Sequence, residues 1–310
     1  MLNPKTIHQL SEILGSDRLK KNVSLASHTT FGIGGPAQLF YKAKTSKELI
    51  RVIKAARELK IPYFILGGGS NILVADRGLV GLTIKIQNSK FKVQNYRIIA
   101  EAGTPLAKVV KAAQEHSLSG LECCIGIPGT VGGAVAGNAG DKNQWISQCI
   151  KSVTILDKSG KIINLKKDNC QFGYRTSCFK DNPSKIILEA ILELKKENSK
   201  TIKEKTKQFL EAKGNQPKEK SAGSIFKNPA NDSAGRLIDA AGLKGKKVGE
   251  AQISPQHANF IINLGRAKAK DVLTLIRLAQ NEVKEKFGVE LELEIKLIGF
   301  KRKEIENIIN

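Results

Sequence analysis

The 310-residue sequence contains few cysteines and histidines and no long apolar segment. Its five cysteines show no Cys-x-x-Cys spacing and are odd in number, which argues against a disulfide framework and against a cysteine metal site. The four histidines are scattered without ligand spacing, so no metal is expected. The longest uncharged apolar run, 123–137, is too short to span a bilayer, and the first residues lack the apolar core of a signal peptide. We therefore expect a cytoplasmic protein that does not insert into a membrane.

Acidic residues are also scarce, since 29 Asp and Glu face 51 Lys and Arg and leave a net charge of +22. Such a surplus suggests a partner rich in phosphate. Aromatic residues for base stacking make up only 5% of the chain, and Lys far outnumbers Arg, the residue that reads base edges. We therefore expect no nucleic acid, and the surplus can steer anionic small substrates. A basic protein that binds nucleic acid or an acidic polymer stays an alternative.

The common nucleotide and hydrolase motifs are missing, namely G-x-x-x-x-G-K-[ST], a helix-opening G-x-G-x-x-G and G-x-S-x-G. Two glycine-rich stretches are present instead. One is G-I-P-G-T-V-G-G-A-V-A-G-N-A-G at 126–140, and the other is G-G-G-S-N at 67–71, directly after the apolar run 63–66. Main-chain N–H groups without Cβ bulk can cradle a pyrophosphate. A tight loop between strands explains one such stretch equally well, but two of them favour a ligand with two phosphates.

Hydrophobic periodicity divides the chain into three regions. Residues 37–86 read as a strand–helix–strand unit, and the next region holds a strand at 97–102, a helix from 104 and a hairpin around 157–160. The third region has a Lys-rich helix near 199–212, an amphipathic helix at 271–287 and an alternating strand at 289–297 with one acidic face. The Lys-rich helix at the start of the third region is typical of a domain junction.

Eight blocks, in order along the chain, resemble the UDP-N-acetylenolpyruvoylglucosamine reductase family. They are T-T-F-G-I-G-G-P-A (29–37), G-G-G-S-N-I-L-V (67–74), G-I-P-G-T-V-G-G-A (126–134) with N-A-G (138–140), F-G-Y-R-T-S (172–177), S-A-G-S-I-F-K-N-P (221–229), A-G-L-K-G (241–245), H-A-N-F (257–260) and L-E-L-E-I-K (291–296). The resemblance implies two FAD-binding subdomains of the vanillyl-alcohol-oxidase (PCMH) type, residues 1–88 and 89–197, followed by an α+β substrate domain, residues 198–310. It also implies the shorter branch, which lacks an additional tyrosine-bearing insertion.

The resemblance further implies bound FAD and NADPH as co-substrate, in an enzyme that makes UDP-N-acetylmuramate for peptidoglycan. The implied FAD contacts are Thr30, Ile33, Gly34, Gly67, Gly68, Gly69, Ser70, Asn71, Pro128, Gly129, Thr130, Gly132 and Gly133. The implied catalytic residues are Arg175, which holds the substrate carboxylate, Glu294, which orients the reacting group, and Ser224, which donates a proton to carbon. Whether Glu294 is protonated stays open.

Substrate contacts are implied at Tyr174, Lys213, Asn228 and His257, and a monomer is expected. A related FAD oxidoreductase of the same fold, acting on another alcohol or sugar, is the alternative within enzymes. It would share the glycine stretches but has no reason to carry the 221–229 and 291–296 blocks.

Overall fold

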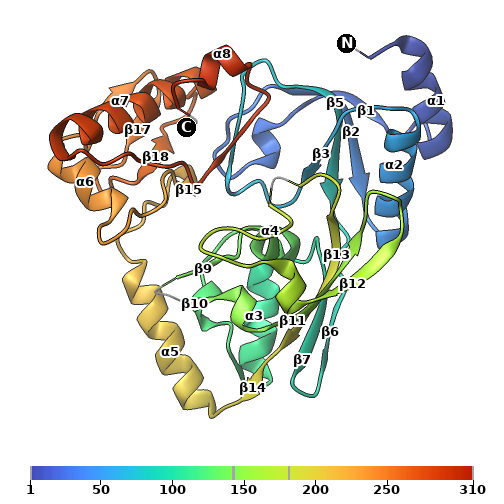
Figure 1. The fold of residues 1–310 in the computed structure, drawn as a ribbon, viewed down its shortest axis with the longest axis horizontal. Helices are drawn as coiled ribbons and strands as arrows, with labels where there is room; N and C mark the ends of the chain where they lie inside the picture. The colour runs from blue at the N-terminus through green and yellow to red at the C-terminus, as the bar shows by residue number, and fades with distance from the viewer. Residues whose placement is uncertain (1, 142–143, 181, 309–310) are drawn as a thin grey trace.

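The computed structural model describes residues 2–141, 144–180 and 182–308, which fold around three main sheets (Figure 1). The first sheet (blue) lies at the upper right of the view, the second (green to yellow) below it, and the third (orange) at the upper left. The expected α+β class is confirmed. Within the described ranges, no helix combines enough length and apolarity to cross a membrane.

The first sheet is mixed, with the order β1-β2-β5-β3, and only β1 is antiparallel to its neighbour. Its strands are β1 (Lys20–Ser24), β2 (Pro36–Ala43), β5 (Leu79–Ile86) and β3 (Tyr63–Leu66), and its helices are α1 (Pro4–Leu14) and α2 (Ser46–Glu58). The Thr45 hydroxyl caps α2 by accepting a hydrogen bond from the Glu48 N–H, and Val52 and Ile53 are fully buried. The β2–α2–β3 order confirms the predicted strand–helix–strand unit.

The second sheet is antiparallel throughout, with the order β12-β11-β13-β7-β6. Its strands are β12 (Ile162–Lys166), β11 (Ile150–Leu156), β13 (Ile186–Glu193), β7 (Arg97–Glu101) and β6 (Phe91–Gln94). The helices of this region are α3 (Leu106–Glu115) and α4 (Val131–Ala136). Two short strand pairs lie outside the main sheet, β8 (Leu118–Ser119) with β14 (Lys195–Lys196) and β9 (Gly140–Asp141) with β10 (Gln144–Trp145). The β11–β12 pair confirms the predicted hairpin. One continuous apolar core joins the first and second sheets.

The third sheet is antiparallel, with the order β15-β18-β17-β16, and it packs with the C-terminal helices. Its strands are β15 (Lys220–Ser224), β18 (Phe260–Asn263), β17 (Ala251–Ile253) and β16 (Lys247–Val248), and the helices of this region are α5 (Ser199–Ala212), α6 (Ala234–Ala240), α7 (Ala269–Phe287) and α8 (Arg302–Ile305). α7 ends at Gly288 in the left-handed conformation, with φ 68°, as its sequence predicts. Phe31, Ile33 and Leu73, from the N-terminal part of the chain, are buried in the core of this region.

The C-terminal region is tied to the N-terminal one by a parallel strand pair, β19 (Lys296–Ile298) with β4 (Ile72–Val74). The Asp76 carboxylate adds a second link by accepting hydrogen bonds from the first N–H groups of α7, those of Ala269 at 2.8 Å and Lys270 at 3.2 Å. Segments far apart in the sequence are thereby held beside the two glycine-rich stretches.

The predicted strand at 289–297 is only partly a strand. Regular pairing is limited to β19, with one isolated bridge between Phe226 and Leu293. The alternation of less and more exposed residues holds over 289–292 and is lost at Leu293 and Glu294, which are both half-buried. The acidic face is not uniform either. The Glu292 side chain is 72% exposed, whereas that of Glu294 is 15% exposed. Glu292 pairs with Lys227 and Glu294 pairs with Arg175, and an alternating sequence pattern does not predict these partners.

Candidate active site

A single cleft of about 1220 Å³ lies where the three regions meet. Its wall contains both glycine-rich stretches, the turn that carries Arg175, the end of β15 with Ser224, and Glu294. Eleven of the thirteen residues predicted to bind FAD line it, as do all seven of the predicted catalytic and substrate-contact residues. The fold therefore gathers segments that are dispersed along the sequence.

The two glycine-rich stretches lie against each other, backbone to backbone. A Cβ added to Gly68 would come within 2.5 Å of the Gly129 Cα, so no side chain fits at this crossing. The Ser70 hydroxyl donates a hydrogen bond of 2.9 Å to the Pro128 carbonyl and fixes the pairing. Together the loops line one side of the cleft.

Different glycines in these stretches are needed for different reasons. Gly69 has φ 71°, and a Cβ there would lie 2.3 Å from the His28 carbonyl oxygen, while one on Gly132 would lie 2.9 Å from the Ala102 Cβ. Chain packing alone requires these two glycines. Gly133 also lines the cleft, but the nearest atom to its added Cβ is the Thr130 Oγ1 at 3.6 Å. Packing does not explain that glycine, whereas a ligand against its main chain does.

Thr30 reaches the cleft, but Ile33 and Gly34 do not line it. The Thr30 hydroxyl donates a hydrogen bond of 2.8 Å to the Ser221 carbonyl and so joins the N-terminal turn to β15. Ile33 is 2% exposed and packs in the C-terminal core. A Cβ on Gly34 would meet Leu25 and Val74. These two residues shape the turn from behind, and their contact with FAD stays a prediction.

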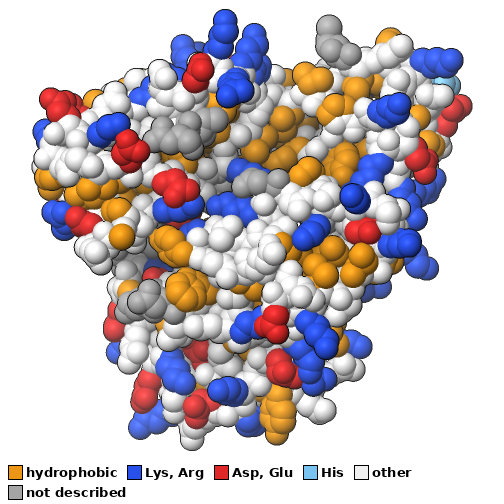
Figure 2. Space-filling view, viewed as in Figure 1, with side chains coloured by type: hydrophobic (Ala, Val, Ile, Leu, Met, Phe, Trp, Pro, Cys, Tyr) orange, Lys and Arg blue, Asp and Glu red, His pale blue; other side chains and the backbone are white. Residues whose placement is uncertain are grey.

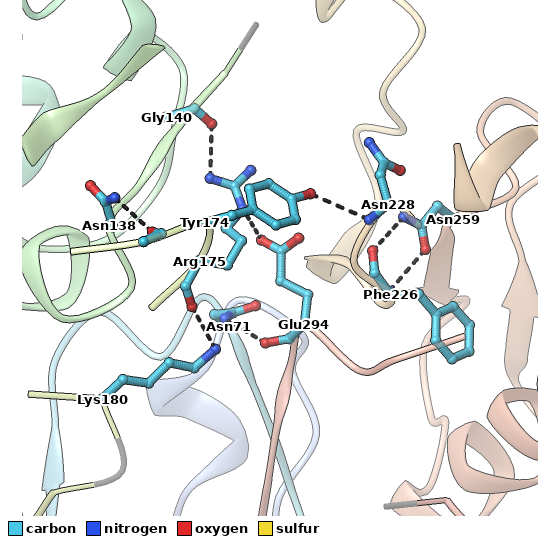
Figure 3. Close-up of polar contacts among 11 residues, drawn as sticks. Asn71, Asn138, Gly140, Tyr174, Arg175, Lys180, Phe226, Asn228, Asn259 and Glu294 are labelled. Atoms are coloured by element: carbon cyan, nitrogen blue, oxygen red, sulfur yellow. Dashed lines mark hydrogen bonds and ion pairs between the residues drawn. The ribbon is translucent and has the colours of Figure 1, made fainter. Parts of the chain in front are cut away.

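Arg175 lies in a tight turn in which Gly173 and Thr176 form the closing bridge. Its backbone has φ 55°, a left-handed conformation that is costly for a residue with a Cβ and clusters at functional sites. Two neighbours hold the turn: Asn138 Nδ2 donates to the Gly173 carbonyl at 2.8 Å, and Arg175 Nη1 donates to the Gly140 carbonyl at 3.0 Å. Figure 3 shows these contacts converging from one side.

Glu294 approaches Arg175 from the opposite side of the cleft (Figure 3). The Arg175 Nε and Glu294 Oε1 atoms are 2.8 Å apart, an ion pair whose N–H is not aligned for a hydrogen bond. Burial raises the pKa of the Glu294 carboxyl, and the positive charges of Arg175, Lys180 and Lys227 counter part of that rise. The pair thus combines a fixed cation with a carboxyl that can gain a proton.

Ser224 is presented to the cleft by an irregularity in β15. The pairing register with β18 shifts between Ser221 and Ser224, and Gly223, at φ 79°, supplies the left-handed residue of this bulge. The Ser224 hydroxyl makes no hydrogen bond to any residue in the described part of the chain, and the residue lines the cleft. Its proton is available to a ligand.

The predicted substrate contacts lie on two sides of the cleft. Tyr174 accepts a hydrogen bond of 3.3 Å from the Asn228 N–H, and the Asn228 side-chain oxygen accepts one of 3.1 Å from the Ala234 N–H. Burial lowers the pKa of His257, whose Nδ1 accepts from the Asn259 N–H at 3.2 Å, so the ring is a neutral Nε2–H donor. Burial also lowers the pKa of Lys213, whose Nζ donates to the Ile125 carbonyl at 2.6 Å.

Several lysines of the cleft belong to no sequence motif, so the sequence does not distinguish them from ordinary surface lysines. Lys180 donates a hydrogen bond of 2.9 Å to the Arg175 carbonyl and faces Glu294. Among the described lining residues, seven Lys and Arg face three Asp and Glu. Figure 2 shows basic side chains spread over all parts of the visible face, without the single stripe that a nucleic-acid track would form. The excess inside the cleft suits an anionic ligand.

The cleft fits FAD on features of the chain itself. Its volume exceeds the usual range for small-ligand pockets, its wall is bare main chain at Gly133 and at the Gly68–Gly129 crossing, and cations outnumber carboxylates. Phosphate oxygens are bound by N–H donors and positive charge, and the cleft must also be long enough to hold the flavin ring.

Comparisons with known proteins agree with this geometry. Residues 36–166 match the family described as FAD binding domain, and residues 216–298 match UDP-N-acetylenolpyruvoylglucosamine reductase, C-terminal domain. The UDP-N-acetylenolpyruvoylglucosamine reductase of Clostridium tetani is 46% identical over 94% of this chain and 96% of its own length, and that of Caldanaerobacter subterraneus subsp. tengcongensis is 41% identical over 95% and 98%. The crystal structure of the Thermus caldophilus reductase superposes with a TM-score of 0.80 at 39% identity, covering 91% of this chain and 99% of that one. The expected order of an FAD-binding fold followed by a C-terminal α+β domain is confirmed.

Proposed function

The chain belongs to the UDP-N-acetylenolpyruvoylglucosamine reductase family, and from this premise we propose how its own residues carry out the reaction. It is an FAD-dependent oxidoreductase that uses NADPH to reduce the enolpyruvyl group of UDP-N-acetylenolpyruvoylglucosamine, which yields UDP-N-acetylmuramate for peptidoglycan precursors. The observation that carries the assignment of residues is the convergence of Arg175, Ser224 and Glu294 on one cleft.

The two glycine-rich stretches hold the cofactor in this proposal. Main-chain N–H groups of the 67–71 stretch and of Gly129 and Thr130 would bind the diphosphate, and Thr30 closes the site from the N-terminal turn. The N–H groups of residues 131–133 already donate hydrogen bonds within the chain. FAD held by these residues would supply the hydride chemistry that links NADPH to the vinyl CH2 carbon of the substrate. The chain must then manage the negative charge and the proton that complete the reduction.

Arg175 binds the substrate carboxylate and stabilises the charge that develops there. Its Nε faces Glu294 and its Nη1 donates to Gly140, while Nη2 has no hydrogen-bond partner in the described part of the chain. A guanidinium can therefore offer Nη2 and the remaining Nη1 proton as a fork to two carboxylate oxygens. Glu294, held by the ion pair, fixes the direction of that fork and offers its second oxygen to the reacting group.

Ser224 donates the proton that completes the reaction. Its O–H bond breaks as a new C–H bond forms at the carbon that bears the ether oxygen and the carboxylate. The resulting alkoxide regains a proton from water. A positioned donor of this kind contributes about 10²–10⁴ in rate. Tyr174, Lys213, Asn228 and His257 surround the same space and would contact the nucleotide-sugar.

The domain boundaries 1–88, 89–197 and 198–310 are part of the same proposal. They are supported by the three sheets, each of which falls within one of these ranges. We propose that the enzyme acts as a monomer in the cytoplasm.

The two half-reactions, followed by flavin absorbance without oxygen, test the assignment. NADPH should bleach the flavin of the purified protein, and the enolpyruvyl substrate should restore the colour. Bleaching without substrate-dependent recovery would favour a related oxidoreductase of the same fold. A protein that purifies without flavin and takes up none would favour the basic binding protein.

A further inference from the structure

Asn259 is a buried side chain in the cleft wall that the reaction has not yet used. It belongs to the H-A-N-F block, lines the cleft and is 3% exposed. Its carboxamide forms two hydrogen bonds with the main chain of Phe226. The Phe226 N–H donates to Oδ1 at 2.9 Å, and Nδ2 donates to the Phe226 carbonyl at 2.8 Å. The Ile225 N–H also donates to the Asn259 main-chain oxygen at 2.8 Å.

The segment bonded to Asn259 lies next to two of the proposed catalytic residues. It follows Ser224 directly, and on its other edge the Glu294 N–H donates to the Ile225 carbonyl at 2.8 Å. A second bond of 2.8 Å runs from the Lys227 N–H to the Glu292 carbonyl, and Phe226 forms a bridge with Leu293. Residues 225–227 are therefore a short link with Ser224 at one end and Glu294 along one side. Figure 3 shows Asn259 beside Phe226.

The two hydrogen bonds to Phe226 require a donor and an acceptor on one short side chain. Asn offers both, whereas Asp in its charged form offers only acceptors and would face the Phe226 carbonyl with negative charge. In a buried place a lost partner costs more than the mean value of a hydrogen bond, so the segment would shift to find another one. A shift of about 1 Å in a reacting group can cost about 100-fold in rate.

We propose that Asn259 is a positioning residue for proton transfer: by holding Phe226 it sets where the Ser224 hydroxyl lies relative to Glu294 and the substrate carbon. This inference rests on the proposed role of Ser224. It predicts an effect on reoxidation of the flavin by the enolpyruvyl substrate and none on reduction by NADPH, because only the first step needs the Ser224 proton.

The test measures both half-reactions of flavin-loaded Asn259→Asp, with and without Ser224→Ala. Alone, Asn259→Asp should slow reoxidation about 10–100-fold and change reduction by less than about 2-fold. In the Ser224→Ala background it should add almost nothing, because residues that act as a unit are not additive. Equal losses in both backgrounds would show that Asn259 acts independently of Ser224 and would overturn the inference. A normal rate for Asn259→Asp would overturn it too. A normal rate for Ser224→Ala would instead refute the proposed function of Ser224.

The pH profile gives a readout that general loosening of the fold would not produce. A protonated Asp has the same donor and acceptor pattern as Asn, and burial favours the protonated form. Reoxidation by Asn259→Asp should therefore recover toward the wild-type rate as pH falls, while Asn259→Ser, which carries no titrating group, should show no such recovery. A parallel pH response in both variants would count against the inference. If Asn259→Asp does not fold, the same pair of backgrounds is measured with Asn259→Ser.

Asn263, on strand β18, provides a matched control for Asn259, which lies in the turn just before that strand. It is 5% exposed, accepts hydrogen bonds from the Gly265 and Ala267 N–H groups at 2.9 and 3.1 Å, and donates one of 3.0 Å to the Phe31 carbonyl. Asn263→Asp should lower the melting temperature to a similar extent, yet the loaded enzyme should keep reoxidation within about 2-fold of wild type. A loss equal to that of Asn259→Asp would show that the effect is general destabilisation of this region.

Discussion

The Arg175 guanidinium and the Glu294 carboxylate meet across the cleft, with Nε and Oε1 2.8 Å apart. The two side chains are 22% and 15% exposed, and they come from the second and third regions of the chain. Figure 3 shows the two side chains reaching toward each other from different segments of the chain. The pair sets the charge that an anionic substrate meets.

Replacing Glu294 should change how stability depends on pH. Burial raises the pKa of this carboxyl above its usual 4.5, so the folded state holds the proton more tightly than the unfolded chain does. The contribution of Glu294 to the free energy of unfolding is therefore greatest below the usual value and falls as pH rises through the raised one. Glu294→Gln cannot titrate, and its stability relative to wild type should increase over that interval. Urea unfolding of both proteins at several pH values measures this, and the opposite slope would show that Arg175 outweighs burial.

The left-handed backbone at Arg175 predicts a separation of stability from activity. With φ 55°, this position favours Gly over Ala by about 1 kcal/mol, so Arg175→Gly should be more stable than Arg175→Ala. Both should lose about 10²–10³ in the rate of reoxidation by substrate, since each lacks the charged donor. Gln171 is an exposed matched position with φ 49°, where the same two substitutions should differ in stability and leave the rate unchanged. Equal stability of the Arg175 variants in denaturant unfolding would contradict the turn geometry.

Removing the Ser224 hydroxyl should block one half-reaction selectively. Ser224→Ala should keep its yellow flavin and be bleached by NADPH at the wild-type rate. Its reoxidation by the enolpyruvyl substrate should slow by about 10²–10⁴, because the carbon loses its positioned proton donor. Stopped-flow absorbance resolves the two steps. Normal reoxidation would remove Ser224 from the mechanism.

Two glycine substitutions distinguish ligand contact from chain packing. At Gly133, within α4, a Cβ meets nothing closer than 3.6 Å, so Gly133→Ala should leave the flavin-free protein as stable as wild type or raise its stability by up to about 1 kcal/mol. If FAD lies against this main chain, the affinity for FAD should nevertheless fall. Gly68→Ala forces a Cβ to 2.5 Å from the Gly129 Cα and should destabilise the protein with or without FAD. Melting temperatures and FAD titrations measure both effects, and unchanged affinity in Gly133→Ala would separate this glycine from the cofactor.

Local patterns along the chain were enough to predict much of the fold. The apolar stripes of α2, α3 and α7, the cap at Thr45 and the glycine after α7 are set by contacts within a few residues, and these helices are present where the periodicity places them. The glycine-rich stretches were recognisable for a similar reason, since an unusual density of glycine requires an explanation in the chain itself. The sequence did not show which of those glycines are required by chain packing and which leave space for a ligand. The reason is that the packing partners, His28 and Ala102, lie elsewhere in the sequence.

The sequence by itself determined the elements, the family blocks and the residue types available for chemistry. Only the tertiary structure decided which members of equivalent patterns become functional. Glu290, Glu292 and Glu294 alternate identically, yet only Glu294 meets Arg175, because residues 225–227 pair with 292–294 and turn that side chain into the cleft. Asn259 and Asn263 are likewise two buried asparagines, the first in the turn before β18 and the second on that strand, and each holds a different segment of the chain. Periodicity records which side of a strand faces inward, whereas the identity of the opposing group depends on segments that the chain brings together over long distances.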